Sequence, residues 1–267
     1  QTALRATGLA LQAAESARSV QVLTLDEVDI LNASVDGIRL SDTEESLRLN
    51  GIDIRQVGGV GLAVSGPGLV RINGAVLEEN AGGGLQREGG YIELKQSVFT
   101  NNGLGVEGGA NVLLGRGVFG QVENNRLSGG VGLDCYQCKE VVVSDNVFEN
   151  YSTGLRLVSS RPRIFSNRFT GGQLAMHISG NVVPIRLDLN IVHDSEEMLV
   201  SEAGPEVVAI NNWWGSDDEA SIKQGMRGQI RWKPFLNFDP RAPLDFALGQ
   251  NYPNPFNAST VIEYQIG

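Results

Sequence analysis

A short pattern recurs along almost the whole chain, and this repeat limits the possible folds more than any other feature of the sequence. Each copy contains an apolar-x-apolar stretch, a polar turn, a large apolar residue and a Gly-apolar-x-apolar segment. The large apolar residue after the turn occurs at Ile30, Ile54, Leu77, Phe99, Leu127, Phe148, Phe169, Val192 and Trp214. Its successive copies are 24, 23, 22, 28, 21, 21, 23 and 22 residues apart. A period in this range is typical of solenoids, in which each unit stacks on the next.

The strands inside each unit indicate which solenoid forms. The Gly-apolar-x-apolar segment keeps the same period, at residues 37–40, 61–64, 84–87, 132–135 and 154–157. The units hold short alternating segments between Gly, Asn, Asp and Ser, and no amphipathic helical stretch. Such a unit cannot bury its apolar face alone, so we expect each strand to pair in parallel with its copy in the next coil. The sequence therefore predicts an all-β fold, a parallel β-helix (solenoid) of about nine coils of ~22 residues.

One polar position repeats together with the coils. An asparagine follows an inward apolar residue by three positions at Asn125, Asn146, Asn167, Asn190 and Asn212. Asparagine tolerates left-handed backbone at a turn, and its amide can bond to the copies above and below it. We predict a structural asparagine ladder along one corner, rather than a ligand site.

The charge balance disfavours some partners. The chain has 267 residues, with 21 Lys+Arg against 31 Asp+Glu and a formal net charge of −10. An acidic chain without basic runs is poorly suited to the phosphate backbone of nucleic acids. No segment approaches the roughly 20 apolar residues of a membrane span. The 34 glycines exceed the usual share of ~7%, and we expect them at corners and strand starts.

The repeat itself carries a family resemblance. Asn-Val-Phe-Glu-Asn at 146–150, with Thr-Gly-Leu-Arg-Leu at 153–157, resembles the right-handed parallel β-helix repeats of pectate-lyase-like proteins and their nitrous-oxide-reductase-accessory relatives. The resemblance covers roughly residues 5–240. Residues 211–215 and 228–236 look like the closing coil and cap of bacterial members. The resemblance implies a right-handed helix and no particular reaction.

A second resemblance lies at the end of the sequence. Residues 249–262, with their Asn-Tyr-Pro-Asn-Pro-Phe core, look like the start of the C-terminal sorting domain of type IX secretion cargo. Ala258 stands where that family usually has Pro, and a Pro-rich linker is the alternative interpretation. We expect a β-helix with a C-terminal cap over 1–240, then a linker and the truncated start of the sorting β-sandwich over 241–267. The resemblance implies a secreted or cell-surface bacterial protein that engages the secretion machinery.

Cys135 and Cys138 form a C-x-x-C motif. An exported protein allows a short-range disulfide between them. A buried thiol is the competing interpretation, because Cys135 aligns with inward apolar residues of other coils. Zinc would need a second pair of ligands, and the two histidines, His177 and His193, lie in other coils. We expect no metal site and no cofactor here.

Side chains that bind or react with a ligand must point outward. In a β-helix, the same outward position of successive coils forms a column of such side chains. The x positions of the Gly-apolar-x-apolar strands form one predicted column, Arg39, Ala63, Gln86, Gly105, Asp134, Arg156, His177 and Leu199. At about 4.8 Å per coil, Asp134, Arg156 and His177 lie next to one another. An acid, a fixed cation and an imidazole in this order are candidate catalytic residues for a lyase that binds a uronate and abstracts its α-proton. Ordinary surface pairing is the alternative.

Other polar groups suggest weaker sites. Arg163 and Arg186 occupy a neighbouring outward column and could join Arg156 in a basic patch for an anionic glycan or cell-surface polymer. A solvated sheet face is the alternative. The acidic clusters at 194–197 and 217–219 contain carboxylates that suit Ca²⁺, but they lack the spacing of a known calcium loop.

Three functions remain open at this point. The leading hypothesis is a non-catalytic extracellular β-helix module that acts as a stalk, an adhesion module or a glycan-binding surface. The motif sets of polygalacturonases, Ser-His-Asp hydrolases and HExxH metalloenzymes are missing. The alternatives are a lyase or related carbohydrate-active enzyme on an acidic polysaccharide, and a structural protein that assembles end to end through exposed strand edges.

Overall fold

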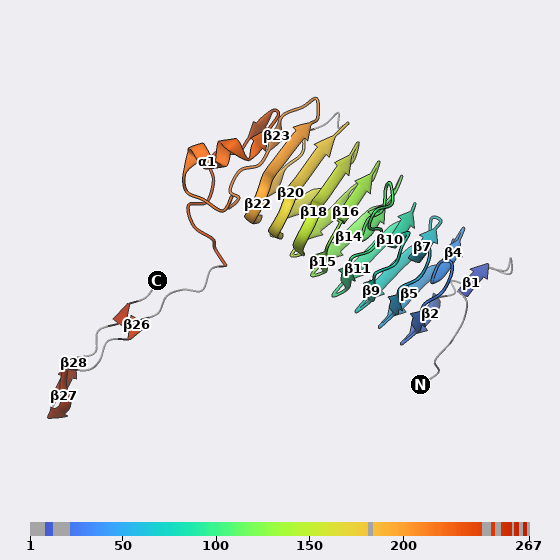
Figure 1. Ribbon diagram of the computed structural model, residues 1–267, viewed down its shortest axis with the longest axis horizontal. Coiled ribbons are helices and arrows are strands. Elements are labelled where there is room, and N and C mark those ends of the chain that lie inside the picture. The colour runs from blue at the N-terminus through green and yellow to red at the C-terminus, as the bar shows by residue number, and fades with distance from the viewer. Residues whose placement is uncertain are drawn as a thin grey trace. The chain divides into compact units, whose positions relative to one another are not determined.

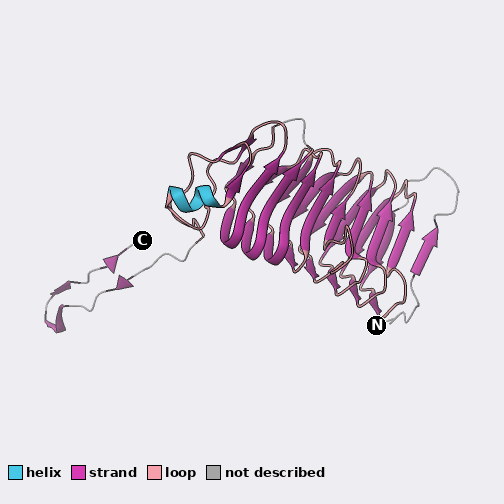
Figure 2. Cartoon of the chain, turned by 45° about the horizontal axis from the view of Figure 1, so that its top comes forward, coloured by secondary structure: helices cyan, strands magenta, loops and turns pink. Residues whose placement is uncertain are grey.

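The computed structural model describes residues 9–12, 22–180, 184–241, 247–248, 252–257, 259–261 and 264–265. The chain forms two compact units, residues 1–237 and 238–267. The first unit is a parallel β-solenoid. Its coils stack in chain order, and each strand pairs with the corresponding strand of the next coil (Figure 1). The described part of this unit is almost entirely strand and turn, with one short helix (Figure 2).

The coils of the solenoid have three faces. The first face is an eight-stranded sheet of β2 (Val22–Asp26), β5 (Ser46–Asn50), β8 (Leu69–Asn73), β11 (Tyr91–Lys95), β14 (Phe119–Glu123), β17 (Val141–Ser144), β19 (Arg163–Phe165) and β21 (Leu187–Asp188). The second face begins with β3 (Asp29–Leu31), β6 (Asp53–Arg55), β9 (Val76–Glu78), β12 (Val98–Thr100) and β15 (Arg126–Ser128). The third face begins with β1 (Leu9–Gln12), β4 (Ile38–Ser41), β7 (Val60–Ser65), β10 (Gly83–Glu88), β13 (Val112–Leu114) and β16 (Val131–Tyr136).

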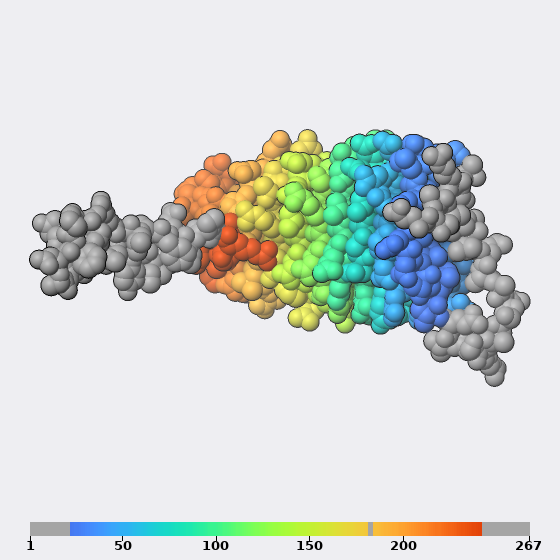
Figure 3. Space-filling model, turned by 90° about the horizontal axis from the view of Figure 1, so that it is seen from below, coloured from blue at the N-terminus to red at the C-terminus, as the bar shows by residue number. Residues whose placement is uncertain are grey.

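Three long strands join the second face to the third. They run across the corner without interruption and merge both faces into one 15-stranded sheet, which ends at β24 (Met226–Arg227). The long strands are β18 (Val147–Val158), β20 (Arg168–Ser179) and β22 (Ile191–Glu202). In the space-filling view of Figure 3, successive coils form consecutive bands of colour along the unit.

The predicted repeat and the observed register agree. The marker residues pair strand by strand from Ile30 to Val192, and Trp214 continues the column through the neighbouring Ile191–Trp213 bridge. All of these markers are at most 3% exposed, so they form one continuous column through the core. The prediction of a β-helix of about nine coils is therefore confirmed, because each small unit buries its apolar face only against its neighbours.

A left-handed residue turns the chain between the first and second faces in every coil. This column is Glu27, Gly51, Gly74, Gln96, Asn124, Asp145, Ser166, Leu189 and Asn211, with φ between 51° and 65°. Most of its members are not glycine, although left-handed backbone favours glycine. Backbone bonds between coils hold the conformation, for example from the Leu189 amide to the Asn211 carbonyl at 3.1 Å.

The five asparagines follow this left-handed residue directly. From Asn125 to Asn212, each Nδ2 donates to the Oδ1 of the next asparagine at 3.0 Å. Each side chain is at most 2% exposed. Ser97 extends the column by one coil, since its amide donates to Asn125 Oδ1 at 3.0 Å. The ladder thus satisfies polar groups that the corner buries.

A second buried asparagine series lies at the corner between the second and third faces. Asn80 Nδ2 donates to Asn102 Oδ1 at 2.8 Å, and Asn102 Nδ2 donates to Asn111 Oδ1 at 2.9 Å. The sequence offered part of this signal, since Asn80 and Asn102 are one repeat apart. Asn111 follows only nine residues later, because residues 103–110 loop out between two neighbouring positions of the series.

The same insertion shifts the outward column of the third face. Gly105 was the predicted member, but it lies in the loop, and Leu113 pairs with both Gln86 and Asp134. Leu199 was also wrong: it pairs with Met176 and is fully buried, whereas Val200 pairs with His177. The reason is that the offset between paired residues changes from 21 between β18 and β20 to 23 between β20 and β22.

One inward position holds a charge. Arg87 occupies the core slot between Val64 and Leu114 and has no exposed surface. Its guanidinium donates to the Gly68 carbonyl at 2.7 Å and the Gly66 carbonyl at 2.9 Å. Burial lowers the pKa of Arg87 to about 10. The side chain therefore takes the place of an aliphatic residue and supplies donors to the carbonyls of the preceding corner.

The last coils of the first unit close with a short helix. β23 (Val207–Val208) pairs with β25 (Ile230–Arg231), and α1 (Glu219–Gln224) lies between them in the sequence. Asp218 caps α1 by accepting from the Ser221 amide at 2.9 Å. The predicted closing residue Trp214 is fully buried.

The second unit contains two antiparallel strand pairs. β26 (Ala247–Leu248) pairs with β29 (Tyr264–Gln265), and β27 (Tyr252–Asn257) pairs with β28 (Ser259–Val261). The predicted start of a sorting domain falls on this unit. Several of its residues, including Ala258, lie outside the described ones, so the sorting function stays a prediction.

Candidate functional site

Asp134, Arg156 and His177 lie side by side on the third face. β16, β18 and β20 pair in parallel, with Asp134 opposite Arg156 and Arg156 opposite His177. The outward column that the repeat predicts is thus present at these three positions. Their contacts decide which chemistry the column can perform.

Asp134 and Arg156 form a tight pair. Arg156 Nη2 donates to Asp134 Oδ2 at 2.5 Å, and the two side chains are 29% and 6% exposed. The bond to Asp134 raises the pKa of the Arg156 guanidinium above its ordinary value. The other carboxylate oxygen, Asp134 Oδ1, is buried and has no hydrogen-bond partner among the described residues. The cation therefore neutralises the acid of its own column, while one acceptor remains unfilled.

His177 makes its contact on the opposite side. Its Nε2 lies 3.5 Å from Glu202 Oε2, a residue of the next coil. A lyase needs its cation against the substrate carboxylate and its base against the α-proton. Here the Arg156 guanidinium is engaged by Asp134, and the imidazole faces Glu202. The three candidates are neighbours in the sheet, and none of them lines either of the two hollows described below.

A hollow of about 230 Å³ lies beside the preceding coils. The insertion covers it with residues 107–110, and Gln86 and Leu113 of the outward column line it. Val60 and Leu85 add apolar surface. The hollow ends one coil before Asp134, since Leu113 is the direct neighbour of Asp134 in the sheet.

Two of the three arginines of the predicted basic patch are neighbours, because Arg163 and Arg186 directly precede Ile164 and Leu187, which pair on the first face. Arg156 lies on the third face, whereas Arg163 lies on β19 of the first face. Arg186 bonds to Asp188 of its own coil. The Arg163 guanidinium carbon lies 6.0 Å from the centroid of the Phe165 ring. Arg163 and Arg186 thus share the first face, apart from Arg156, and Asp188 neutralises Arg186.

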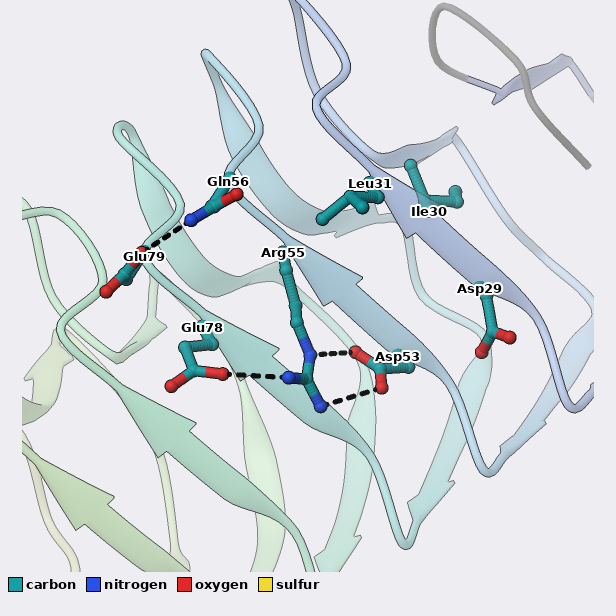
Figure 4. Close-up of a pocket in the computed structure, with 8 residues that line it drawn as sticks. All are labelled: Asp29, Ile30, Leu31, Asp53, Arg55, Gln56, Glu78 and Glu79. Carbon is teal, nitrogen blue, oxygen red and sulfur yellow. Dashed lines mark hydrogen bonds and ion pairs between the residues drawn. The ribbon is translucent and has the colours of Figure 1, made fainter.

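A larger hollow on the second face was not predicted. It has a volume of about 560 Å³ and is shown in Figure 4, lined by Asp29, Ile30, Leu31, Asp53, Arg55, Gln56, Glu78 and Glu79. The Arg55 guanidinium is held by Asp53 at 2.6 Å and by Glu78 at 3.2 Å. Gln56 Nε2 donates to Glu79 Oε2 at 2.8 Å. The repeat spacing contains the signal, because Asp29 and Asp53 share one column and Arg55 and Glu78 share another.

The comparisons with known proteins agree with this architecture. The family model described as "Right handed beta helix region" matches residues 19–196. The chain belongs to the right-handed β-helix family. Searches of curated proteins and of solved structures found no match. The family membership of this β-helix establishes its fold and leaves its activity to be argued from the site.

The two cysteines of the β-helix are free thiols in the structure. Cys135 is fully buried and Cys138 is 4% exposed. Burial and a hydrogen bond with Cys138 raise the pKa of the Cys135 thiol, and the hydrogen bond is the larger cause. The predicted inward position of Cys135 agrees with its pairing to Leu114 and Leu157.

Three members of the two acidic clusters, Glu197, Asp218 and Glu219, have partners within the β-helix. Glu197 accepts from Arg227 Nη2 at 2.9 Å, and Glu219 pairs with Lys233. Asp218 caps α1, and its bonds to Ser221 lower the pKa of its carboxyl. Across the described residues, no group of three or more His, Cys, Asp or Glu side chains is placed to hold a metal ion. Within the same residues, no helix is long and apolar enough to cross a membrane.

Proposed function

We propose that this β-helix is an extracellular or cell-surface module that acts as a non-catalytic stalk or spacer. The observation that carries the proposal is the pairing of outward charges between neighbouring coils. Such pairs are Arg55–Glu78, Arg71–Glu93, Lys95–Glu123, Arg126–Glu149, Arg156–Asp134, Arg227–Glu197 and Arg231–Glu206.

Charges paired in this way contact neighbouring coils rather than a substrate. Each exposed pair contributes about 0–1 kcal/mol, so the pairs add little stability one by one. They connect neighbouring coils and occupy the charges that form them. Together with the buried asparagine ladder, these contacts between coils favour a stiff stack.

Turnover and binding assays test the proposal. We would incubate the purified chain with polyuronates and sulfated glycans, follow the absorbance of unsaturated products, and measure binding by calorimetry. A stalk should give no more product than buffer. Steady product formation by the wild-type chain would contradict the non-catalytic role.

One observation favours a second candidate, a site for an acidic polysaccharide on the column of Asp134, Arg156 and His177. The buried Asp134 Oδ1 lacks a donor, and a hydroxyl of a sugar could supply one. Under this alternative, Arg156→Ala and His177→Ala should abolish binding or turnover. Arg39→Ala is the matched control, because Arg39 lies in the same column and pairs with Asp36 near the other end. Equal behaviour of all three variants would exclude this site.

Export rests on the sequence of the second unit. The Asn-Tyr-Pro-Asn-Pro-Phe segment supports secretion through a type IX pathway. Deletion of residues 238–267 from the protein in its own bacterium should remove it from the cell surface, as read by protease accessibility on intact cells. Unchanged surface display would refute the sorting role. End-to-end assembly stays a prediction, which light scattering at rising concentration tests.

A further inference from the structure

Cys135 and Cys138 lie on either side of one corner of the β-helix. Cys135 is near the end of β16, and its neighbours in the core column are Leu114 and Leu157. Gln137, with φ of 52°, turns the chain toward the first face. Both cysteines are at most 4% exposed, so they enter the same interior although only two residues separate them.

The Cys138 side chain reaches the strand that lies directly beside Cys135, because Leu114 pairs with Cys135 in the sheet. Cys138 Sγ donates to the Leu114 carbonyl at 3.1 Å. A disulfide requires Cα atoms about 4.4–6.8 Å apart. Only Tyr136 and Gln137 separate the two cysteines, and both cysteine side chains lie in the same hydrophobic core.

The next coil fixes both ends of the corner. The Gln137 amide donates to the Val158 carbonyl at 2.8 Å, and the Cys138 amide donates to Ser160 Oγ at 3.0 Å. Ser160 Oγ in turn bonds to the Cys135 carbonyl at 2.9 Å. One hydroxyl therefore holds the backbone of both cysteines, which keeps the two thiols together.

We propose that Cys135 and Cys138 form a disulfide that closes this corner when the protein folds in an oxidising compartment. The inference rests on the proposed export for its setting, and on the corner geometry for its chemistry. The cross-link would connect the end of the third face to the start of the first face within one coil. It lies directly after the irregular coil that carries the insertion.

The chemistry is a thiol–disulfide exchange with an external disulfide, such as oxidised glutathione. One cysteine thiolate attacks the external disulfide, and a mixed disulfide forms as one external thiol leaves. The second cysteine then attacks the mixed disulfide and releases the other external thiol. The cysteines lose two protons and two electrons, and the external disulfide is reduced to two thiols. Because the folded corner buries both sulfur atoms, we place these steps during folding.

Refolding tests the cross-link without reference to export. The purified chain is unfolded in reductant and refolded in a glutathione redox buffer or in reductant alone. Free thiols are then counted by maleimide labelling in denaturant, and peptides are mapped by mass spectrometry. We expect the oxidised sample to lose both free thiols and two hydrogen atoms of mass, with Cys135 linked to Cys138. We also expect its Tm to exceed that of the reduced sample by roughly 4–8 °C.

Two results would overturn the proposal: thiols that stay free or carry glutathione after oxidative refolding, or an oxidised form that melts below the reduced one. Cys135→Ala and Cys138→Ala are matched controls that should abolish the difference in Tm between the buffers. If a variant does not fold, the thiol count of the wild-type chain still decides. A cross-link that forms on refolding, in a protein found reduced inside cells, would refute the location and leave the corner chemistry intact.

Discussion

Replacement of Asn146 by alanine tests the structural role of the asparagine ladder. Asn146 has no exposed surface and stands in the middle of the column. Its Nδ2 donates to the Val122 carbonyl at 2.8 Å and to Asn167 Oδ1 at 3.0 Å. Its Oδ1 accepts from the amide and the side chain of Asn125, both at 3.0 Å. The substitution removes all four bonds at once.

The expected loss follows from those bonds. A protein hydrogen bond contributes about 0.5–1.5 kcal/mol net, so four of them give roughly 4 kcal/mol. The Asn125 amide loses its acceptor in the buried corner, and this places the value toward the upper end. Such a loss is a large share of the ~5–15 kcal/mol that stabilises a typical domain.

Urea unfolding followed by far-UV circular dichroism and by tryptophan fluorescence measures this loss. Solenoids can lose coils separately, so a single free energy of unfolding is defined only when the two probes report the same transition. Asn73→Ala is the matched control, since Asn73 is exposed on the first face and should change the free energy of unfolding by less than about 0.5 kcal/mol. Equal effects of the two substitutions would refute the ladder as a source of stability.

Three further predictions concern other buried groups. Phe148 and Phe169 stack with centroids 4.6 Å apart, so Phe169→Ala should lower the free energy of unfolding by about 3–5 kcal/mol in urea, and a loss below ~1 kcal/mol would contradict the stacked core. Arg87→Met leaves the Gly66 and Gly68 carbonyls without their donor, and we expect a cost of about 2–4 kcal/mol; an unchanged Tm would show that the guanidinium is dispensable. Burial raises the pKa of Tyr151 to about 12, so the folded state favours the neutral phenol, and the wild-type chain should lose stability relative to Tyr151→Phe as pH rises from about 10 to 12. The difference between their phenolate absorbance titrations should have its midpoint near 12, and a midpoint near 10 would contradict the buried position.

Positions with a constant offset could be predicted from the sequence, and positions near a change of offset could not. The core markers recur at every coil, so both their burial and their pairing follow from the spacing. The prediction that Gly105 belongs to the outward column was wrong because residues 103–110 loop out of the coil. Composition alone does not show where such a loop begins and ends. Arg87 occupies a core slot that the pattern reserves for aliphatic residues, and only the carbonyls around it explain the exchange.

The sequence predicted the order of the candidate site residues along the sheet, but not the contacts that their side chains make. The repeat places Asp134, Arg156 and His177 next to one another. Whether the guanidinium serves a ligand or its neighbour depends on side-chain directions, which the spacing does not encode. The pair of Asp134 with Arg156 and the contact of His177 with Glu202 therefore emerge only from the three-dimensional structure.

Single-molecule pulling on the first unit, with handles at residues 22 and 237, tests the stalk proposal most directly. Charge pairs and the buried ladder join neighbouring coils, so we expect the unit to keep its folded length until discrete ruptures occur. Release of one coil should free ~22 residues, or roughly 70 Å of chain, and larger steps should be multiples of that length. Continuous lengthening at the low forces that straighten an unfolded chain would contradict the account.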